Sequence, residues 1–90
     1  MNPFVDEIVE KTALAADLEA STVRELLVVP PDESLGDFAV PCFTLAKRLR
    51  KSPVQIAAEV VERVTPMIEG GDRIATVSAA GPYVNFTLHR

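Results

Sequence analysis

The first apolar positions of the chain recur with the spacing of an amphipathic helix. Apolar side chains gather on one side of the first two turns, at Phe4, Val5, Ile8 and Val9. Asn2 is suited to capping free backbone amides, and Pro3 fits the first helical position. We therefore predict an N-terminal helix that ends near Ala16.

A short apolar run, Leu26–Val29, is rich in β-branched residues and predicts a buried strand. Ser21 and Thr22 indicate a break in the chain before it. Pro30 and Pro31 end the strand, because proline has no amide hydrogen for a sheet ladder. The polar residues that follow are expected to form a loop.

The next apolar positions again have helical spacing and predict a second helix. Its stripe consists of Phe38, Cys42, Leu45 and Leu49. Asp37 is a suitable cap, although Pro41 can displace the start of the helix to its own position. Phe43, like Phe38, is expected to lie in the core.

A third helix is predicted to begin at Ser52 and Pro53, a capping residue followed by a proline. Its apolar stripe is formed by Ala57, Val60, Val61 and Val64. Pro66 should end or kink this helix, and two glycines mark the loop beyond it.

Two strands are predicted at the end of the chain. Residues 73–80 alternate between small apolar and polar side chains, and Gly81 and Pro82 form a corner. In the last strand the apolar residues Val84, Phe86 and Leu88 face one way, and Tyr83, Asn85, Thr87 and His89 face the other. The predicted fold of residues 1–90 is a single α+β domain, an α/β architecture with a small antiparallel sheet of three to four strands packed against about three helices.

Composition and charge restrict the possible functions. The 90 residues carry a net charge of −4, which argues against a general nucleic-acid binder. The charge is uneven, however, because residues 1–46 sum to −7 and residues 47–90 sum to +3. No run of apolar residues is long enough for a membrane span, no signal peptide is present, and a single cysteine favours the cytoplasm.

The last strand carries the most informative polar pair. Tyr83 and Asn85 are two residues apart, so the ring and the amide lie side by side on one face. A ring that stacks beside an amide that reads a base edge suits unpaired RNA nucleotides. From the residues alone, an ordinary polar sheet face is the favoured interpretation, since outward polar residues are the rule on half-buried sheets.

A basic cluster, Lys47, Arg48, Arg50 and Lys51, has two interpretations that the sequence leaves open. It is either a contact for phosphates or a solvated helix face whose cations complement the helix dipole. Asp32, Glu33 and Asp37 match no metal-binding spacing and are better explained as a loop and a helix cap. His89, the only histidine, has no cysteine partner nearby, and no phosphate-binding glycine loop is present.

Four segments of the chain resemble the N-terminal additional domain of arginyl-tRNA synthetases. They are Leu35–Ala39, Leu45–Lys47, Pro53–Ala57 and Ala80–Phe86, in the order and spacing of that family. The resemblance covers residues 24–88 and implies an α/β fold with a small antiparallel sheet. It also implies that the domain contacts the D-loop at the outer corner of the tRNA.

The resemblance assigns roles to residues of the last strand and its corner. Tyr83 would stack on a D-loop nucleotide, Asn85 would hydrogen-bond one, and Gly81 begins the contacting strand. Some relatives carry asparagine where this chain has Ala80, which removes one polar contact. The implied partners are tRNA-Arg and the catalytic domain of a parent synthetase.

The signature sequences of a synthetase catalytic domain are missing from these 90 residues. The domain is therefore not expected to act as an enzyme alone or to bind a cofactor, and ATP and arginine would bind the catalytic domain. We expect a monomer without membrane contact. The alternative is a free-standing relative of the domain that acts as a protein-interaction module through its sheet face or a helix face.

Overall fold

The computed structural model describes residues 3–71 and 73–89, which form an α+β fold as predicted. The helical elements within these ranges are α1 (Pro3–Ala16), α2 (Ala20–Leu26), the 3₁₀ helix η1 (Glu33–Leu35), α3 (Leu45–Leu49) and α4 (Pro53–Ile68). The strands are β1 (Phe38–Pro41), β2 (Ile74–Ala80) and β3 (Tyr83–Leu88). The predicted end of the first helix at Ala16 is confirmed, whereas its proposed cap, Asn2, lies outside the described residues.

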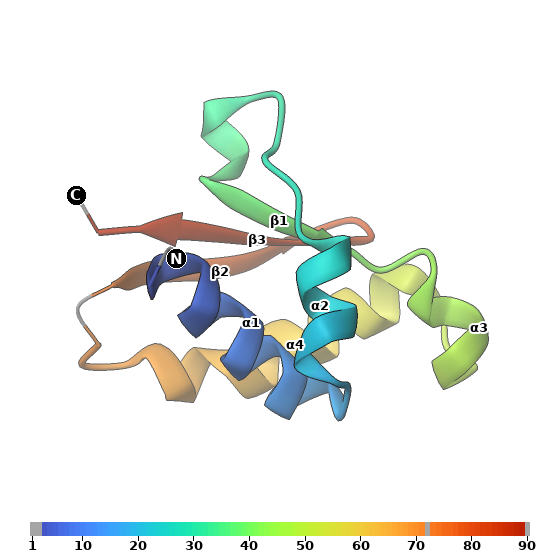
Figure 1. The fold of residues 1–90 in the computed structure, drawn as a ribbon. Coiled ribbons are helices and arrows are strands. Elements are labelled where there is room, and N and C mark those ends of the chain that lie inside the picture. Colours follow the sequence, from blue (N-terminus) through green and yellow to red (C-terminus); the bar gives the residue numbers. More distant parts are fainter. Residues whose placement is uncertain (1–2, 72, 90) are drawn as a thin grey trace.

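The three strands form one antiparallel sheet in the order β1-β3-β2, so the last strand lies in the middle (Figure 1). The hairpin between β2 and β3 turns at Gly81 and Pro82, with Ala80 paired to Tyr83. Gly81 has a φ of 57°, a positive value at the first central position of the turn, as type II′ hairpins require. The predicted register of β3 is confirmed, because Val84 and Phe86 are completely buried.

The core lies between one face of the sheet and the helices α1 and α4 (Figure 1). Both helices contribute an apolar stripe, as their sequence spacing predicts. The fully buried side chains include Ile8 and Val9 of α1, Val64 of α4 and Phe86 of β3. The opposite face of the sheet, which carries the side chains of Tyr83 and Asn85, faces away from these helices.

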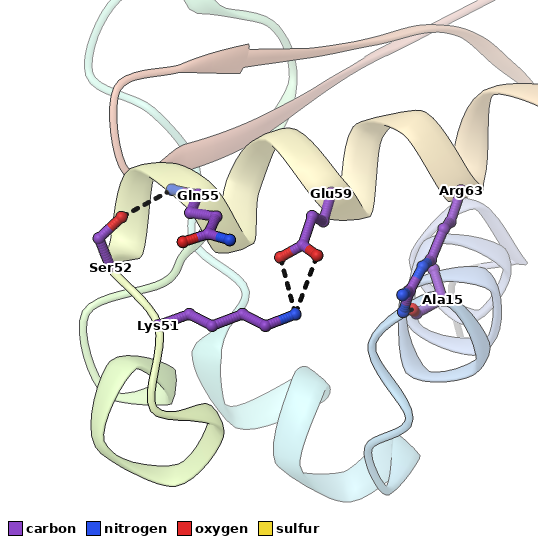
Figure 2. A network of polar contacts seen from close by, with 6 residues as sticks. All are labelled: Ala15, Lys51, Ser52, Gln55, Glu59 and Arg63. Carbon is purple, nitrogen blue, oxygen red and sulfur yellow. Dashed lines mark hydrogen bonds and ion pairs between the residues drawn. The ribbon is translucent and has the colours of Figure 1, made fainter.

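Polar contacts cap helix α4 and join it to the end of α1 (Figure 2). Ser52 caps α4 as predicted, since its hydroxyl accepts a hydrogen bond of 3.1 Å from the amide of Gln55. Farther along α4, the Arg63 guanidinium donates a 2.9 Å hydrogen bond to the carbonyl of Ala15 in the last turn of α1. This bond satisfies a carbonyl that the end of α1 leaves without an intrahelical donor. The helix continues two residues past Pro66 and ends at Ile68.

The prediction of a helix beginning near Asp37 is wrong for its first half. Phe38–Pro41 is strand β1, and only Leu45–Leu49 is helical. The alternation of four residues fits a strand as well as a helix, and the edge of β3 offers hydrogen-bond partners to an extended chain. Pro41 also disfavours a helix interior, whereas it is tolerated at the end of an edge strand.

The predicted strand at Leu26–Val29 is also wrong, apart from one residue. Leu26 ends helix α2, which the sequence analysis did not anticipate, and only Val28 pairs, through two hydrogen bonds with Ala39 of 2.8 and 2.9 Å. Pro30 follows too closely for a ladder to extend. The sheet therefore gains a single bridge beyond β1 instead of a fourth strand.

The turn at Gly36 and Asp37 locks the start of β1 onto β3. The Asp37 amide donates to the Phe86 carbonyl at 2.8 Å, and the Asp37 carboxylate accepts from the Leu88 amide at 2.8 Å. Gly36 has a φ of 108°, and a Cβ placed there would lie 2.7 Å from the Phe86 carbonyl oxygen. Asp37 is therefore a cross-sheet clamp and not the predicted helix cap.

Cys42 follows β1 and is completely buried. Burial raises the pKa of its thiol to about 11, because the charged thiolate is poorly solvated in the core. The thiol is therefore protonated at neutral pH and packs as a small apolar side chain. Cys42 is a structural residue and not a nucleophile.

We predict that Gly36→Ala destabilises the domain by at least about 2 kcal/mol, because the added methyl group meets the Phe86 carbonyl at an unfavourable backbone φ. Gly70→Ala is the matched control, since Gly70 also has a positive φ (76°) but has no atom within 4 Å of the added carbon. The control should lose only about 1 kcal/mol. Urea unfolding of the three proteins measures both values, and equal losses would contradict the close approach at Gly36.

Candidate functional site

Tyr83 and Asn85 lie on the face of β3 opposite the helical layer, as predicted, but they differ in exposure. Tyr83 is 38% exposed, whereas Asn85 is only 6% exposed. Asn85 therefore points to the predicted face but is not an ordinary outward, solvated residue of a half-buried sheet. A loop and not a helix covers this face, because the chain between Val28 and Leu35 returns over β1 and β3 (Figure 1).

The loop leaves a small pocket above Asn85 with a volume of about 180 Å³. This volume is below the roughly 300 Å³ of pockets for drug-sized ligands, so a group of about one ring system is the appropriate occupant. Its walls are apolar except for the phenol and the amide. The lining residues are Val28, Val29, Pro30, Pro31, Leu35, Ala39, Tyr83 and Asn85.

The amide of Asn85 has no side-chain hydrogen bond to any residue in the described ranges. A carboxamide has two donor hydrogens and an acceptor oxygen, and buried polar groups are normally paired. The sheet ladder uses only the backbone of Asn85, which pairs with Ala39 and Ser78. The side chain therefore keeps its hydrogen-bonding capacity for a group that enters the pocket.

Phe43 lies beside this site, contrary to the prediction that it belongs to the core. Its side chain is 54% exposed, and its ring meets that of Tyr83 edge to face, with centroids 5.6 Å apart and an interplanar angle of 82°. Phe38 is half-buried and packs against the core, in agreement with the prediction. Two rings, those of Phe43 and Tyr83, are thus presented together at one end of the sheet.

The basic cluster begins directly after this ring pair. Lys47, Arg48 and Arg50 are exposed and have no ion pair within the described part of the chain. Lys51 differs, because its ammonium group is bound to both carboxylate oxygens of Glu59 at 2.9 and 3.0 Å (Figure 2). The structure thus separates the cluster into three unpaired cations and one paired cation.

The basic helix is joined to the hairpin by the backbone. The Cys42 amide donates a 2.9 Å hydrogen bond to the carbonyl of Pro82, in the turn that precedes Tyr83. Helix α3 follows within three residues of Cys42 and lies beyond the hairpin end of the sheet (Figure 1). The rings and the cations therefore share one end of the molecule.

The corner residues assigned by resemblance lie at the same end. Ala80 is half-buried and closes the hairpin opposite Tyr83. Gly81 is exposed, and no atom lies within 4 Å of where its Cβ would be. Both residues present backbone and no polar side chain to solvent.

The acidic residues of the loop do not form a metal site. Asp32 accepts a 2.9 Å hydrogen bond from the amide of Ser34, which lowers the pKa of the Asp32 carboxyl and stabilises the turn. Asp37 is used in the clamp to β3, and His89 is exposed at the end of that strand. Over residues 3–71 and 73–89, we found no group of three metal-ligating side chains and no helix that could span a membrane.

The arrangement defines an α+β domain with an aromatic and amide pocket beside a basic helix. The family described as "Arginyl tRNA synthetase N terminal domain" matches residues 4–88. The chain belongs to this family.

Individual relatives give the same result. The arginine–tRNA ligase of Clostridium perfringens is 43% identical over 83 residues, which is 92% of this chain and 14% of the relative. The Streptococcus agalactiae arginine–tRNA ligase is 45% identical over 74 residues, 82% of this chain and 12% of the relative. Arginyl-tRNA synthetase of Thermus thermophilus has a similar structure, with a TM-score of 0.67 and 31% identity over 92% of this chain and 13% of the other. The chain thus spans about one seventh of these proteins.

Sequence reasoning found Tyr83 and Asn85 but missed the residues that surround them. Pro30 was assigned only to the end of a strand and Leu35 to a loop, and Phe43 was assigned to the core. No local pattern indicates that the loop returns over the sheet, because its position depends on the distant contact of Asp37 with β3.

We predict that Asn85→Ala changes the free energy of unfolding by no more than about 0.5 kcal/mol, because the amide has no partner within the described chain to leave unsatisfied. The contrasting variant is Asp37→Ala, which deprives the Leu88 amide of its acceptor and should cost about 1–3 kcal/mol. Chemical denaturation measures both. A loss of 2 kcal/mol or more for Asn85→Ala would indicate a structural role for the amide.

Proposed function

We propose that this domain binds tRNA-Arg through the D-loop at the outer corner of the tRNA. The unpaired amide of Asn85 at the floor of the pocket is the observation that supports this proposal most directly. A looped-out base has the size of one ring system and a hydrogen-bonding edge that matches a carboxamide. Tyr83 then stacks on the base while Asn85 binds its edge.

Three exposed cations contribute the sequence-independent part of the binding. Lys47, Arg48 and Arg50 have no ion pair in the described chain and lie at the pocket end of the sheet, where they can contact phosphates. The acidic N-terminal half limits binding elsewhere on the surface, because like charges repel. The domain thus combines one base contact with a local positive patch.

Binding at the tRNA corner has a positioning role. The relatives are arginine–tRNA ligases about seven times as long as this chain, so a catalytic domain would supply the sites for ATP and arginine. Fixing the corner of the tRNA orients its acceptor end towards that domain and lowers the entropic cost of the reaction. We assign this tRNA-binding function to the cytoplasm, in agreement with the single buried and reduced cysteine.

The proposal is tested by titrating the 90-residue chain with tRNA-Arg and following its amide signals by NMR. Tyr83→Ala and Asn85→Ala should each weaken binding roughly tenfold, because stacking and base hydrogen bonds contribute about 1–3 kcal/mol each. Leu14→Ala is the matched control, since Leu14 is 75% exposed on helix α1 and should bind like the unmodified chain. Unchanged affinity in both site variants, or binding only to a protein partner, would reject the proposal.

The basic helix gives a separate prediction. Lys47→Ala and Arg48→Ala should each weaken tRNA binding and reduce the slope of log K against log salt by about 0.7–0.9, the value for one phosphate contact. Lys51→Ala should change the slope less, because the Lys51 ammonium is already paired with Glu59. Affinity measured between about 50 and 200 mM salt tests this difference. Equal slopes for all four proteins would exclude α3 from the interface.

A further inference from the structure

Phe43 carries a large apolar ring that does not belong to the hydrophobic core. It is 54% exposed, in a chain whose other described phenylalanines, Phe4, Phe38 and Phe86, are half-buried or fully buried. Its one recorded ring contact is with Tyr83, edge to face at 5.6 Å. What distinguishes Phe43 from the other exposed apolar residues is its contact with an aromatic residue of the binding pocket.

The backbone holds the two rings in fixed relative positions. Pro41 pairs with Tyr83 at the end of the β1–β3 ladder, and the Cys42 amide donates to the Pro82 carbonyl at 2.9 Å. Phe43 and Tyr83 each follow one residue after this hydrogen bond. Complete burial of Cys42 anchors the same point to the core, so little freedom is left in the approach of the rings.

The two rings have different relations to the pocket. Tyr83 lines it, whereas Phe43 is not among its lining residues. Tyr83 thus both lines the pocket and contacts Phe43. The hydroxyl of Tyr83 has no hydrogen bond to the described residues, so ring contacts, including the one with Phe43, restrict its side-chain torsions.

We propose that Phe43 is a positioning residue that holds the Tyr83 ring against the pocket, ready to stack on a nucleobase. The inference rests on the proposed function, because it assigns a supporting residue to the same site. A ring fixed before binding loses less side-chain entropy on binding than a mobile ring. An edge-to-face contact supplies the restraint and covers at most one face of the Tyr83 ring.

The free protein provides the first test, because Tyr83 is the only tyrosine and the chain has no tryptophan. Tyrosine fluorescence anisotropy and ring-proton NMR shifts therefore report on Tyr83 alone. Phe43→Ala should increase the mobility of the Tyr83 ring and move its ring-proton shifts, while circular dichroism stays unchanged. Val54→Ala, at another exposed apolar site (56%), should leave these signals unchanged.

Affinity for tRNA-Arg provides the second test. Phe43→Ala should weaken binding roughly three- to tenfold at an unchanged salt slope, and Phe43→Tyr should restore it. In a protein that already carries Tyr83→Ala, adding Phe43→Ala should not weaken binding further, because the ring to be positioned is absent. This double-mutant cycle separates positioning from direct contact.

Three results would overturn the inference. If Phe43→Ala weakens binding equally with and without Tyr83, Phe43 contacts the RNA itself. If it changes neither ring mobility nor affinity while Tyr83→Ala weakens binding, the proposed function stands and the positioning role is wrong. If tRNA binding does not depend on Tyr83 at all, the proposed function fails and the inference fails with it.

Discussion

The clamp between Asp37 and strand β3 is the interaction on which the candidate site depends. One residue satisfies two backbone groups of β3, through its amide and its carboxylate, at 2.8 Å each. The clamp fixes the point at which the loop after Val28 must rejoin the sheet, and Gly36 makes the close approach possible. Since Val28 is itself bonded to Ala39, both ends of the loop are held over the same part of the sheet. A pocket above Asn85 follows from these two attachments.

The elements that the sequence predicts well are those whose signals are local. Helix α4 combines a cap, a first-turn proline and a regular stripe, and strand β3 alternates without exception, so both were placed to within one or a few residues. Segment 38–41 was misassigned because a four-residue alternation carries little information and the pairing partner lies more than forty residues away. Tertiary pairing with β3 decided its conformation, which no window of neighbouring residues reveals.

In the candidate site, too, local features were predicted correctly and features that depend on distant contacts were not. The direction of Tyr83 and Asn85 follows from the period of a strand, and the structure agrees. The burial of Asn85 does not follow from that period, because it depends on a loop fixed by Asp37. Similarly, the four cations look equivalent in sequence, but a partner eight positions away removes Lys51 from the unpaired set. Sequence therefore predicts which side chains share a face and leaves open what covers or pairs them.

The site combines features that do not contribute to folding. The nearly buried Asn85 side chain has no hydrogen-bond partner within the described residues, and two aromatic rings are left partly in solvent. Each is less favourable for folding than a paired or apolar alternative would be. They occur on the central strand, which is paired on both sides, and beside the hydrogen bond between Cys42 and Pro82. Rigid support keeps the pocket formed in the absence of a ligand, so that binding requires little reorganisation of the chain. A domain of this size buries a modest core. These unfavourable features are confined to the half of the central strand nearest the β2–β3 hairpin.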